Sequence, residues 1–158
     1  MKETIAQLRA RRVFDSRGRP TIEVDVRLEG GALGRAIAPA GASRGKREAI
    51  DLRDGGPRFG GFDVTTAIAR VQNEIASALV GRSADDQGAV DAALIALDGT
   101  ANKAHLGGNA MIATSMALAK ARAAARGEPL WKCLSTGEAL RCPLPEIQIF
   151  GGGAHAAR

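Results

Sequence analysis

TIEVDVRLE, at residues 21–29, alternates apolar and polar side chains along its whole length. A period of two places alternate side chains on opposite faces of an extended backbone, so the segment predicts a half-buried β-strand. The apolar face consists of Ile22, Val24, Val26 and Leu28, and the polar face of Thr21, Glu23, Asp25, Arg27 and Glu29. This strand is the clearest structural signal in the chain, and the rest of the fold is built outward from it.

Two further strands are expected beside this one. Residues 4–14 mix β-branched and basic side chains in partial alternation, and residues 15–20 contain turn-forming residues at nearly every position. On the other side, Gly30 and Gly31 predict a hairpin turn into a short strand at residues 32–38. The opening of the chain is therefore predicted to be a three-stranded antiparallel meander.

Helices are predicted after the strands. Apolar side chains recur at three- and four-residue spacing in residues 64–80, and further helices are expected at 87–98, 110–127 and 130–134. The expected N-caps are Asp63, Asp85 or Asp86, and Asn109, with Gly99 ending the second helix. Strands followed by helices indicate an α+β domain, and the Ala-rich third helix is expected to pack closely against a large body.

The last residues indicate the start of a second unit. Residues 144–150, LPEIQIF, are typical of a linker entering a strand, and they run into the glycine-rich stretch 151–158. A strand with no partner leaves backbone groups unsatisfied when it is buried. The prediction is a domain at residues 1–140, with residues 141–158 forming the linker and first strand of another domain.

Composition excludes several classes of protein. The chain has 158 residues, a formal net charge of +5 and 45% hydrophobic residues, which is typical of a folded soluble domain. No apolar run approaches the ~20 residues of a membrane span, and the N-terminus does not resemble a secretion signal, so a cytoplasmic protein is expected. The basic residues are mostly scattered Arg and the aromatic content is 3%, which disfavours nucleic-acid binding.

Residues 39–49, PAGASRGKREA, form the most informative loop. A phosphate-binding P-loop needs four residues between its glycines and Ser or Thr after its Lys, whereas three residues separate Gly41 from Gly45 and Arg47 follows Lys46. What remains is a glycine-hinged loop that presents the Ser43 hydroxyl beside several cations, and such loops often close over phosphorylated substrates. A solvated surface turn is the alternative, and composition alone favours it.

The remaining candidate residues give weaker signals. His155 follows three glycines after the expected strand, where a barrel would place its active-site loops, although an isolated loop histidine is more often incidental. Cys133 and Cys142 are too few for a disulfide scaffold, and with Trp131 nearby they are interpreted as packing residues. The spacing of Glu48, Asp51 and Asp54 does not define a metal site.

Several of these segments together resemble the enolase (phosphopyruvate hydratase) family. The similar stretches are residues 13–24, 39–43, 48–49 with 52–55, 98–100 with 102–103, 106–110 and 152–156, in the family's order. The chain departs from the family pattern at Arg19, Ala40, Gln148 and Gly151. The resemblance implies an α+β N-terminal domain followed by an eight-stranded α/β barrel.

The resemblance also implies a function. Enzymes of this family dehydrate 2-phosphoglycerate to phosphoenolpyruvate with two Mg²⁺ ions. Gly41, Ala42 and Ser43 match the family's mobile loop, in which Ser43 would ligate the second Mg²⁺, and His155 matches a histidine of the substrate pocket. Arg17 and Glu23 match positions at the dimer interface, so a homo-oligomer is expected.

The family's metal-binding carboxylates, acid/base glutamates and lysine base match nothing in residues 1–158, so no catalytic residue is assigned in this chain. It is expected to be the N-terminal part of an enolase-like lyase and to be inactive alone. The alternative is a non-catalytic dimerisation or binding module of enolase ancestry.

Overall fold

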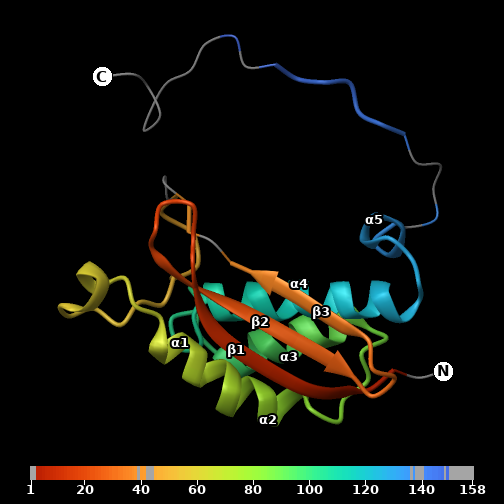
Figure 1. Ribbon diagram of the computed structural model, residues 1–158, viewed down its shortest axis with the longest axis horizontal. Coiled ribbons are helices and arrows are strands. Elements are labelled where there is room, and N and C mark those ends of the chain that lie inside the picture. Colours follow the sequence, from red (N-terminus) through yellow and green to blue (C-terminus); the bar gives the residue numbers. More distant parts are fainter. Residues whose placement is uncertain are drawn as a thin grey trace.

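The computed structural model describes residues 3–38, 40, 41, 45–135, 137, 141–147 and 149. It contains three strands followed by helices (Figure 1), which confirms the predicted α+β class. The strands are β1 (Ile5–Phe14), β2 (Pro20–Leu28) and β3 (Leu33–Ile37), in the spatial order β1-β2-β3 with both pairs antiparallel. The predicted meander is therefore confirmed.

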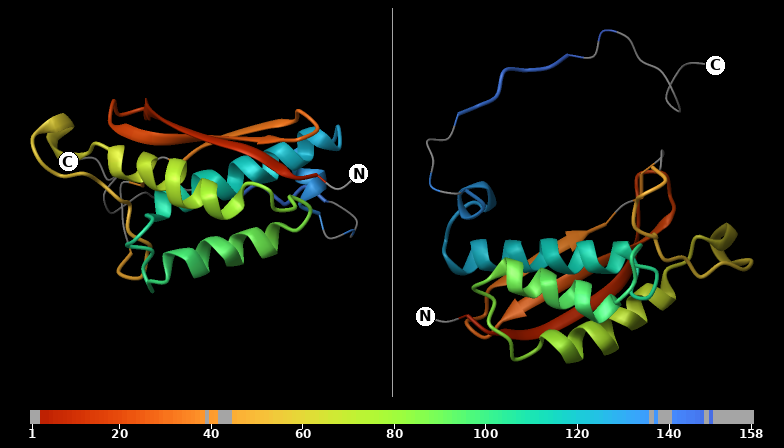
Figure 2. Two further views of the ribbon diagram at one scale, coloured as in Figure 1. Left: turned by 90° about the horizontal axis from the view of Figure 1, so that it is seen from below. Right: turned by 180° about the vertical axis from the view of Figure 1, so that it is seen from behind.

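The helices cover one face of this sheet in two further layers. They are η1 (Arg58–Gly61), α1 (Thr65–Arg70), η2 (Val71–Ile75), α2 (Ala76–Leu79), α3 (Gln87–Asp98), α4 (Gly108–Ala125) and α5 (Leu130–Cys133). The elements α1, η2 and α2 form one continuous rod with a π-helical turn in the middle, where the sequence predicts a single helix. This rod and α4 lie against the sheet, and α3 lies farthest from it (Figure 2).

The core lies between the sheet and the helix layer. The apolar face of β2 is fully buried and packs with side chains of the rod and of α4, as the alternation in residues 21–29 predicts. Ile22, Val24 and Leu28 meet the buried residues Val71 and Leu118 in one continuous cluster. Burial of this apolar surface supplies the main driving force for folding.

The contact between β3 and α4 is unusually close. A Cβ atom at Gly34 would overlap the carbonyl oxygen of Ala117 and the backbone nitrogen of Ala121. The small residues of α4 therefore serve its contact with the chain's own sheet, because only glycine opposite alanine lets the two backbones approach so closely. The expected close packing of the Ala-rich helix is thus observed, and the body that it packs against is the chain's own sheet.

Two of the predicted helix caps are wrong and two are confirmed. Asp86 accepts a hydrogen bond from the Ala89 N–H at 3.0 Å, and Gly99 ends α3 in the left-handed conformation. In contrast, Asp63 pairs with Arg12, and the first turn of α1 is capped by Asp54. Asn109 lies inside α4, which begins at Gly108. In both wrong cases the side chain expected to cap the helix bonds instead to a residue distant in the sequence, Arg12 for Asp63 and Leu52 for Asn109.

The end of the chain differs from the expectation of a strand at residues 144–150. Residues 141–147 and 149 belong to no helix or strand, and their apolar side chains, among them Leu144 and Ile147, are exposed. Gln148, Phe150 and residues 151–158 lie outside the described residues, so the start of a barrel stays a prediction. Cys142 and Trp131 are exposed, which contradicts their interpretation as packing residues, whereas Cys133 is partly buried. Within the described part of the chain, every helix is too short or too polar to span a membrane.

The close approach at Gly34 predicts a large effect of one methyl group. Gly34→Ala should lower the free energy of unfolding by about 3 kcal/mol, because the added carbon forces β3 away from α4. Gly88→Ala in α3 is the matched control, since a Cβ there meets its nearest atom at 3.4 Å. Urea denaturation of both variants measures the difference, and equal stabilities would contradict this packing.

Candidate functional site

Loop 39–47 connects the end of β3 to the segment that we call the strap, residues 48–54. At its start the backbone is held by β2, because the Thr21 hydroxyl donates to the Ala38 carbonyl at 2.7 Å and the Ala38 N–H donates to Ile22 at 3.2 Å. Gly41 is exposed and has no regular structure. Ala42 and Ser43, the other predicted mobile-loop residues, lie outside the described residues.

The strap is fixed to the start of α4 by one buried side chain. The Asn109 amide accepts from the Leu52 N–H at 3.2 Å and donates to the Leu52 carbonyl at 3.1 Å. The two bonds imitate the pairing of one β-residue with its neighbour, so a single amide satisfies both backbone groups of Leu52. We call this pair of hydrogen bonds the Asn109 clamp.

Two glycines let the strap lie this close to the helix. Gly107 has a φ of +90°, and a Cβ there would meet the Leu52 Cβ at 2.5 Å; a Cβ at Gly108 would meet the Ala49 Cβ at 2.8 Å. The Gly108 N–H also donates to the Ile50 carbonyl at 2.7 Å. Gly107, Gly108 and Asn109 therefore act as one unit, and the resemblance motif at residues 106–110 is explained by this contact.

A second loop supports the strap from the other side. The Ile50 N–H donates to the Asn102 carbonyl at 2.7 Å, in the loop between α3 and α4. Asp98 shapes that loop by accepting from the N–H groups of Thr100 at 3.0 Å and Leu106 at 2.8 Å. Burial raises the pKa of Asp98, but these hydrogen bonds outweigh it and the net pKa lies below the ordinary value. The carboxylate is thus a structural anion.

The far end of the strap is held by Arg53 and Asp54. Arg53 pairs with Asp51 at 2.8 Å and donates to the carbonyls of Pro20 and Phe62. Asp54 accepts from the N–H groups of Thr65 at 2.7 Å and Thr66 at 2.9 Å, at the N-terminus of α1. Partial burial raises the Asp54 pKa, but these hydrogen bonds dominate and lower it to about 2. The segments that flank loop 39–47 are therefore both fixed to the rest of the domain by hydrogen bonds.

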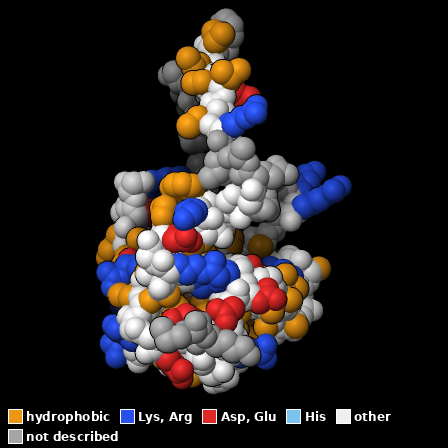
Figure 3. All heavy atoms as spheres, turned by 90° about the vertical axis from the view of Figure 1, so that its right-hand side faces the viewer, with side chains coloured by type: hydrophobic (Ala, Val, Ile, Leu, Met, Phe, Trp, Pro, Cys, Tyr) orange, Lys and Arg blue, Asp and Glu red, His pale blue; other side chains and the backbone are white. Residues whose placement is uncertain are grey.

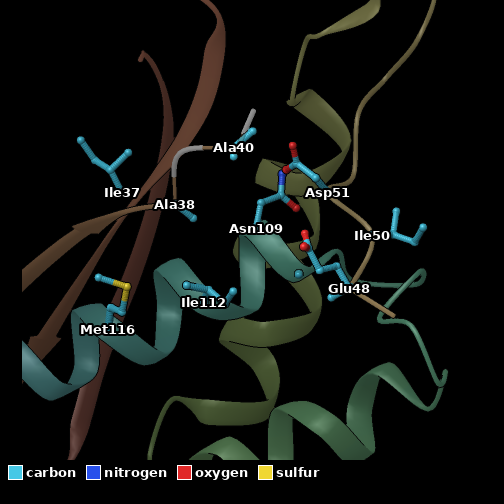
Figure 4. A pocket seen from close by; sticks show the side chains of 12 residues that line it. Ile37, Ala38, Ala40, Glu48, Ile50, Asp51, Asn109, Ile112 and Met116 are labelled. Carbon is cyan, nitrogen blue, oxygen red and sulfur yellow. The ribbon is translucent and has the colours of Figure 1, made fainter. Parts of the chain in front are cut away.

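A groove of about 310 Å³ lies beside this loop, between β3, the strap and α4. Figure 4 shows Asn109 and Asp51 facing each other above the first turn of α4, with Ile112 and Met116 following along the helix. The floor is apolar, and the polar side chains stand at the end nearest the loop. A groove of this size can take part of a small ligand or the side chains of another body.

The described residues do not form a magnesium site by themselves. In this part of the chain no three His, Cys, Asp or Glu side chains stand close enough together to bind a metal ion. Glu48 accepts from the Gly45 N–H at 2.6 Å, and Asp51 is paired with Arg53. Mg²⁺ requires about six oxygen ligands. Ser43 and His155, the predicted metal and substrate residues, lie outside the described residues.

Arg17 and Glu23 lie in different surroundings. Arg17 is exposed in the β1–β2 turn, where its N–H donates to Asp15 at 2.8 Å. Glu23 is 8% exposed on the outer face of the sheet and pairs with Arg11 and, at 3.8 Å, with Arg35. Asp25 bonds to the same two arginines, and the Arg35 hydrogen bond is the main cause that lowers its pKa to about 2. Arg11 and Arg35 were not predicted, although the register places them beside Glu23 and Asp25.

The end of the molecule that carries the C-terminus of α4 mixes both signs of charge (Figure 3). A hollow of about 270 Å³ there is lined by Glu3, Asp85, Arg122 and Arg126. Acidic and basic side chains balance around this hollow, so it does not form a patch of one sign.

Comparison with known proteins places these features in a family. The sequence matches the family model described as "Enolase, N-terminal domain" over residues 5–134, so the chain belongs to the family of enolase N-terminal domains. A curated relative, Enolase 1 of Lactococcus lactis subsp. cremoris (strain SK11), is 51% identical over 156 residues. The match covers 99% of this chain and 37% of that protein. The chain therefore spans little more than a third of the length of this relative.

The Asn109 clamp predicts that removing this one side-chain amide destabilises the folded chain. Asn109→Ala should lower the free energy of unfolding by about 2 kcal/mol, because both backbone groups of Leu52 lose their partner in a partly buried position. Asn102→Ala is the matched control, because Asn102 supports the strap through its carbonyl and its side chain is exposed. Comparable stabilities of the two variants in thermal unfolding would disprove the clamp.

Asp54 predicts a dependence of stability on pH. Its pKa is lower in the folded chain than in the unfolded chain, so the folded form binds fewer protons between about pH 4 and about pH 2. The stabilisation is complete above pH 4 and is lost as the pH falls through this range. Asp54→Asn should flatten the acid decline of the free energy of unfolding, and parallel pH profiles for the two proteins would argue against this role.

Proposed function

We propose that this chain is the N-terminal part of an enolase that dehydrates 2-phosphoglycerate to phosphoenolpyruvate in the cytoplasm. Its role in that reaction is to carry loop 39–47, with Ser43, to the substrate. The observation that carries the proposal is the anchoring of this loop at both ends, by Thr21 and Ile22 on one side and by the Asn109 clamp on the other. Family membership and the relative's name support the choice of reaction.

The chemistry explains why a positioned loop is useful. The proton to be removed lies next to a carboxylate, so its loss creates an intermediate with several negative charges. Mg²⁺, when bound, supplies positive charge to stabilise that intermediate. The hydroxyl of Ser43 would add one oxygen ligand from this chain, and most ligands would come from the part of the enzyme that follows it. Closure of the loop would also exclude water from the reacting atoms.

The acid and base of the reaction are expected outside this chain. Among the described residues near the loop, Glu48 and Asp51 are already bonded to the Gly45 N–H and to Arg53. A general base must reach the proton that it removes, so carboxylates held in this way are poor candidates. We therefore assign the chain a positioning and substrate-covering role, with His155 lining the pocket when the remaining part is present.

We further propose a homodimer in which Arg17 and Glu23 contribute to the interface. The outer face of the sheet supports this, because no helix of the described chain covers it and its Glu23 carboxylate is held by arginines. Arginine is enriched at protein interfaces, where it can exchange or add carboxylate partners. Arg17 is free to approach a second subunit because its side chain is exposed in the turn.

The proposed function predicts that the 158-residue chain alone does not dehydrate 2-phosphoglycerate at saturating Mg²⁺. We define the chimaera as this chain joined to the part of Lactococcus lactis Enolase 1 that follows the aligned region. In the chimaera, Ser43→Ala should lower kcat by about 100-fold, the size expected for losing one group that stabilises developing charge. Ser77→Ala, on an exposed position of α2, is the control and should leave kcat unchanged.

Two results would contradict the proposal. Mg²⁺-dependent turnover by the purified 158-residue chain would show that the catalytic groups lie within it. An unchanged kcat for Ser43→Ala in an active chimaera would remove Ser43 from the site. If neither the 158-residue chain nor the chimaera dehydrates 2-phosphoglycerate, the alternative of a non-catalytic binding module is favoured.

A further inference from the structure

Two charged side chains beside the C-terminal end of α4 are not neutralised by an ion pair. The Oε2 atom of Glu3 and the Nε atom of Arg122 are buried, and neither atom makes a hydrogen bond. In the described part of the chain, no salt bridge joins either side chain to another residue. Buried polar atoms of folded proteins nearly always have a partner, and burying an unpaired charge is costly. A ligand of suitable charge would therefore be attracted to both groups.

Both side chains border one hollow of about 270 Å³. Asp85 and Arg126 complete its charged lining, so the described lining contains two carboxylates and two guanidinium groups. The Asp85 carboxylate accepts from the Ser83 hydroxyl at 3.1 Å, and Arg126 is exposed. Figure 3 shows charges of both signs at this end of the molecule. The hollow thus presents two charges of each sign, and these four described side chains form no ion pair with one another.

The backbone around the hollow is held in place by hydrogen bonds. The Glu3 carbonyl accepts from the Ala84 N–H at 2.7 Å, which ties the start of the chain to the loop before α3. An Nη2–H of Arg122 donates to the Asp85 carbonyl at 2.6 Å, which ties the same loop to the last turns of α4. A site whose groups are already in position loses little conformational freedom when a ligand binds.

The Glu3 carboxylate lies against the turn between β2 and β3. A Cβ atom at Gly30 would stand 3.0 Å from its Oε1 and 3.2 Å from its Oε2, so glycine leaves the room that this carboxylate occupies. The turn keeps water away from one side of the carboxylate, which strengthens its attraction for a cation in the hollow. Carboxylate and guanidinium groups spread their charge over several atoms, so an ion in the hollow can compensate that charge without touching the buried atom.

We infer that this hollow binds a small free α-amino acid as its zwitterion. The carboxylates of Glu3 and Asp85 attract the ammonium group of the ligand. The guanidinium groups of Arg122 and Arg126 attract its carboxylate, because arginine donors match both oxygens of such a group. A water molecule occupies about 30 Å³ in the liquid, so the hollow has room for on the order of ten non-hydrogen atoms. This volume suits a small amino acid.

A ligand with only one sign of charge matches the hollow less well. A simple anion is attracted by Arg122 and Arg126 but repelled by the carboxylates of the same lining. This also applies to 2-phosphoglycerate, whose ionised groups are all negative. In addition, loop 39–47 borders the N-terminal end of α4, and an 18-residue helix is ~27 Å long. The amino-acid site therefore goes beyond the reaction proposed for the loop and does not depend on it.

An NMR titration of the 158-residue chain with L-serine tests this inference. L-Serine should shift the amide signals of Glu3, Arg122 and Arg126 in a saturable manner. N-Acetyl-L-serine lacks the ammonium group and L-serinamide lacks the carboxylate. Each of these two analogues loses one pair of charged partners, so each should bind at least about tenfold more weakly than L-serine.

Substitutions that keep the shape of the side chain locate the site. Glu3→Gln and Arg126→Gln each remove one charge from the hollow, and neither side chain makes a hydrogen bond within the described chain. Both substitutions should weaken L-serine binding at least about tenfold. Glu29→Gln and Arg82→Gln are the matched controls, because they remove the same charges at exposed positions outside the described lining. They should leave the affinity unchanged.

Each outcome supports or overturns the inference. Selective binding of L-serine that both Glu3→Gln and Arg126→Gln weaken supports it. The absence of a saturable shift with L-serine overturns it. Binding of N-acetyl-L-serine or of L-serinamide as tight as that of L-serine would indicate a site for one sign of charge and would also overturn it. So would L-serine binding that neither substitution changes, because the ligand would then lie elsewhere.

Discussion

The double hydrogen bond between the Asn109 amide and the backbone of Leu52 is the contact on which the site depends. It joins the strap to α4, and α4 is itself packed on the sheet through Gly34. The strap that follows loop 39–47 is therefore connected to the core through α4. These contacts are so close that they leave no room for a side chain at Gly107 or Gly108. The segments on both sides of the loop are therefore held by the rest of the domain.

This arrangement separates the rigid parts of the domain from the part proposed to act. Asp54 and Asp98 are structural anions with lowered pKa values, and each closes a loop or a helix end that borders the strap. Their hydrogen bonds are made to backbone N–H groups and to threonine hydroxyls, so these two carboxylates fix the course of the chain.

Much of the fold could be predicted because local patterns and tertiary structure agree. The alternation in residues 21–29 specifies β2, and the glycines at 30, 31 and 99 mark turns that the structure contains. Asp86 caps α3 as expected because no distant residue competes for that helix end. In such places residues close in the sequence make the hydrogen bonds of the backbone, so the local sequence is sufficient to predict the structure.

The anchoring of the site could not be predicted because it depends on contacts across the fold. Asp54 replaces Asp63 as the cap of α1, since Asp63 is drawn into an ion pair with Arg12, 51 positions earlier in the sequence. Asn109 bonds to a backbone 57 positions away, and a lone asparagine after two glycines gives no sign of that partner. Sequence resemblance marked residues 106–110 as important, but only the geometry explains why.

Native-state amide hydrogen exchange, measured by NMR on the 158-residue chain, tests the central claim most directly. Three N–H groups hold the strap in place. That of Leu52 donates to the Asn109 side chain, that of Ile50 to the Asn102 carbonyl, and that of Gly108 to the Ile50 carbonyl. If the strap is held as described, all three amides exchange at least about 100-fold more slowly than in an unfolded chain and open together. Exchange of these amides at the rate of an unfolded chain, while the β2 amides stay protected, would show that the strap is not held by the Asn109 clamp.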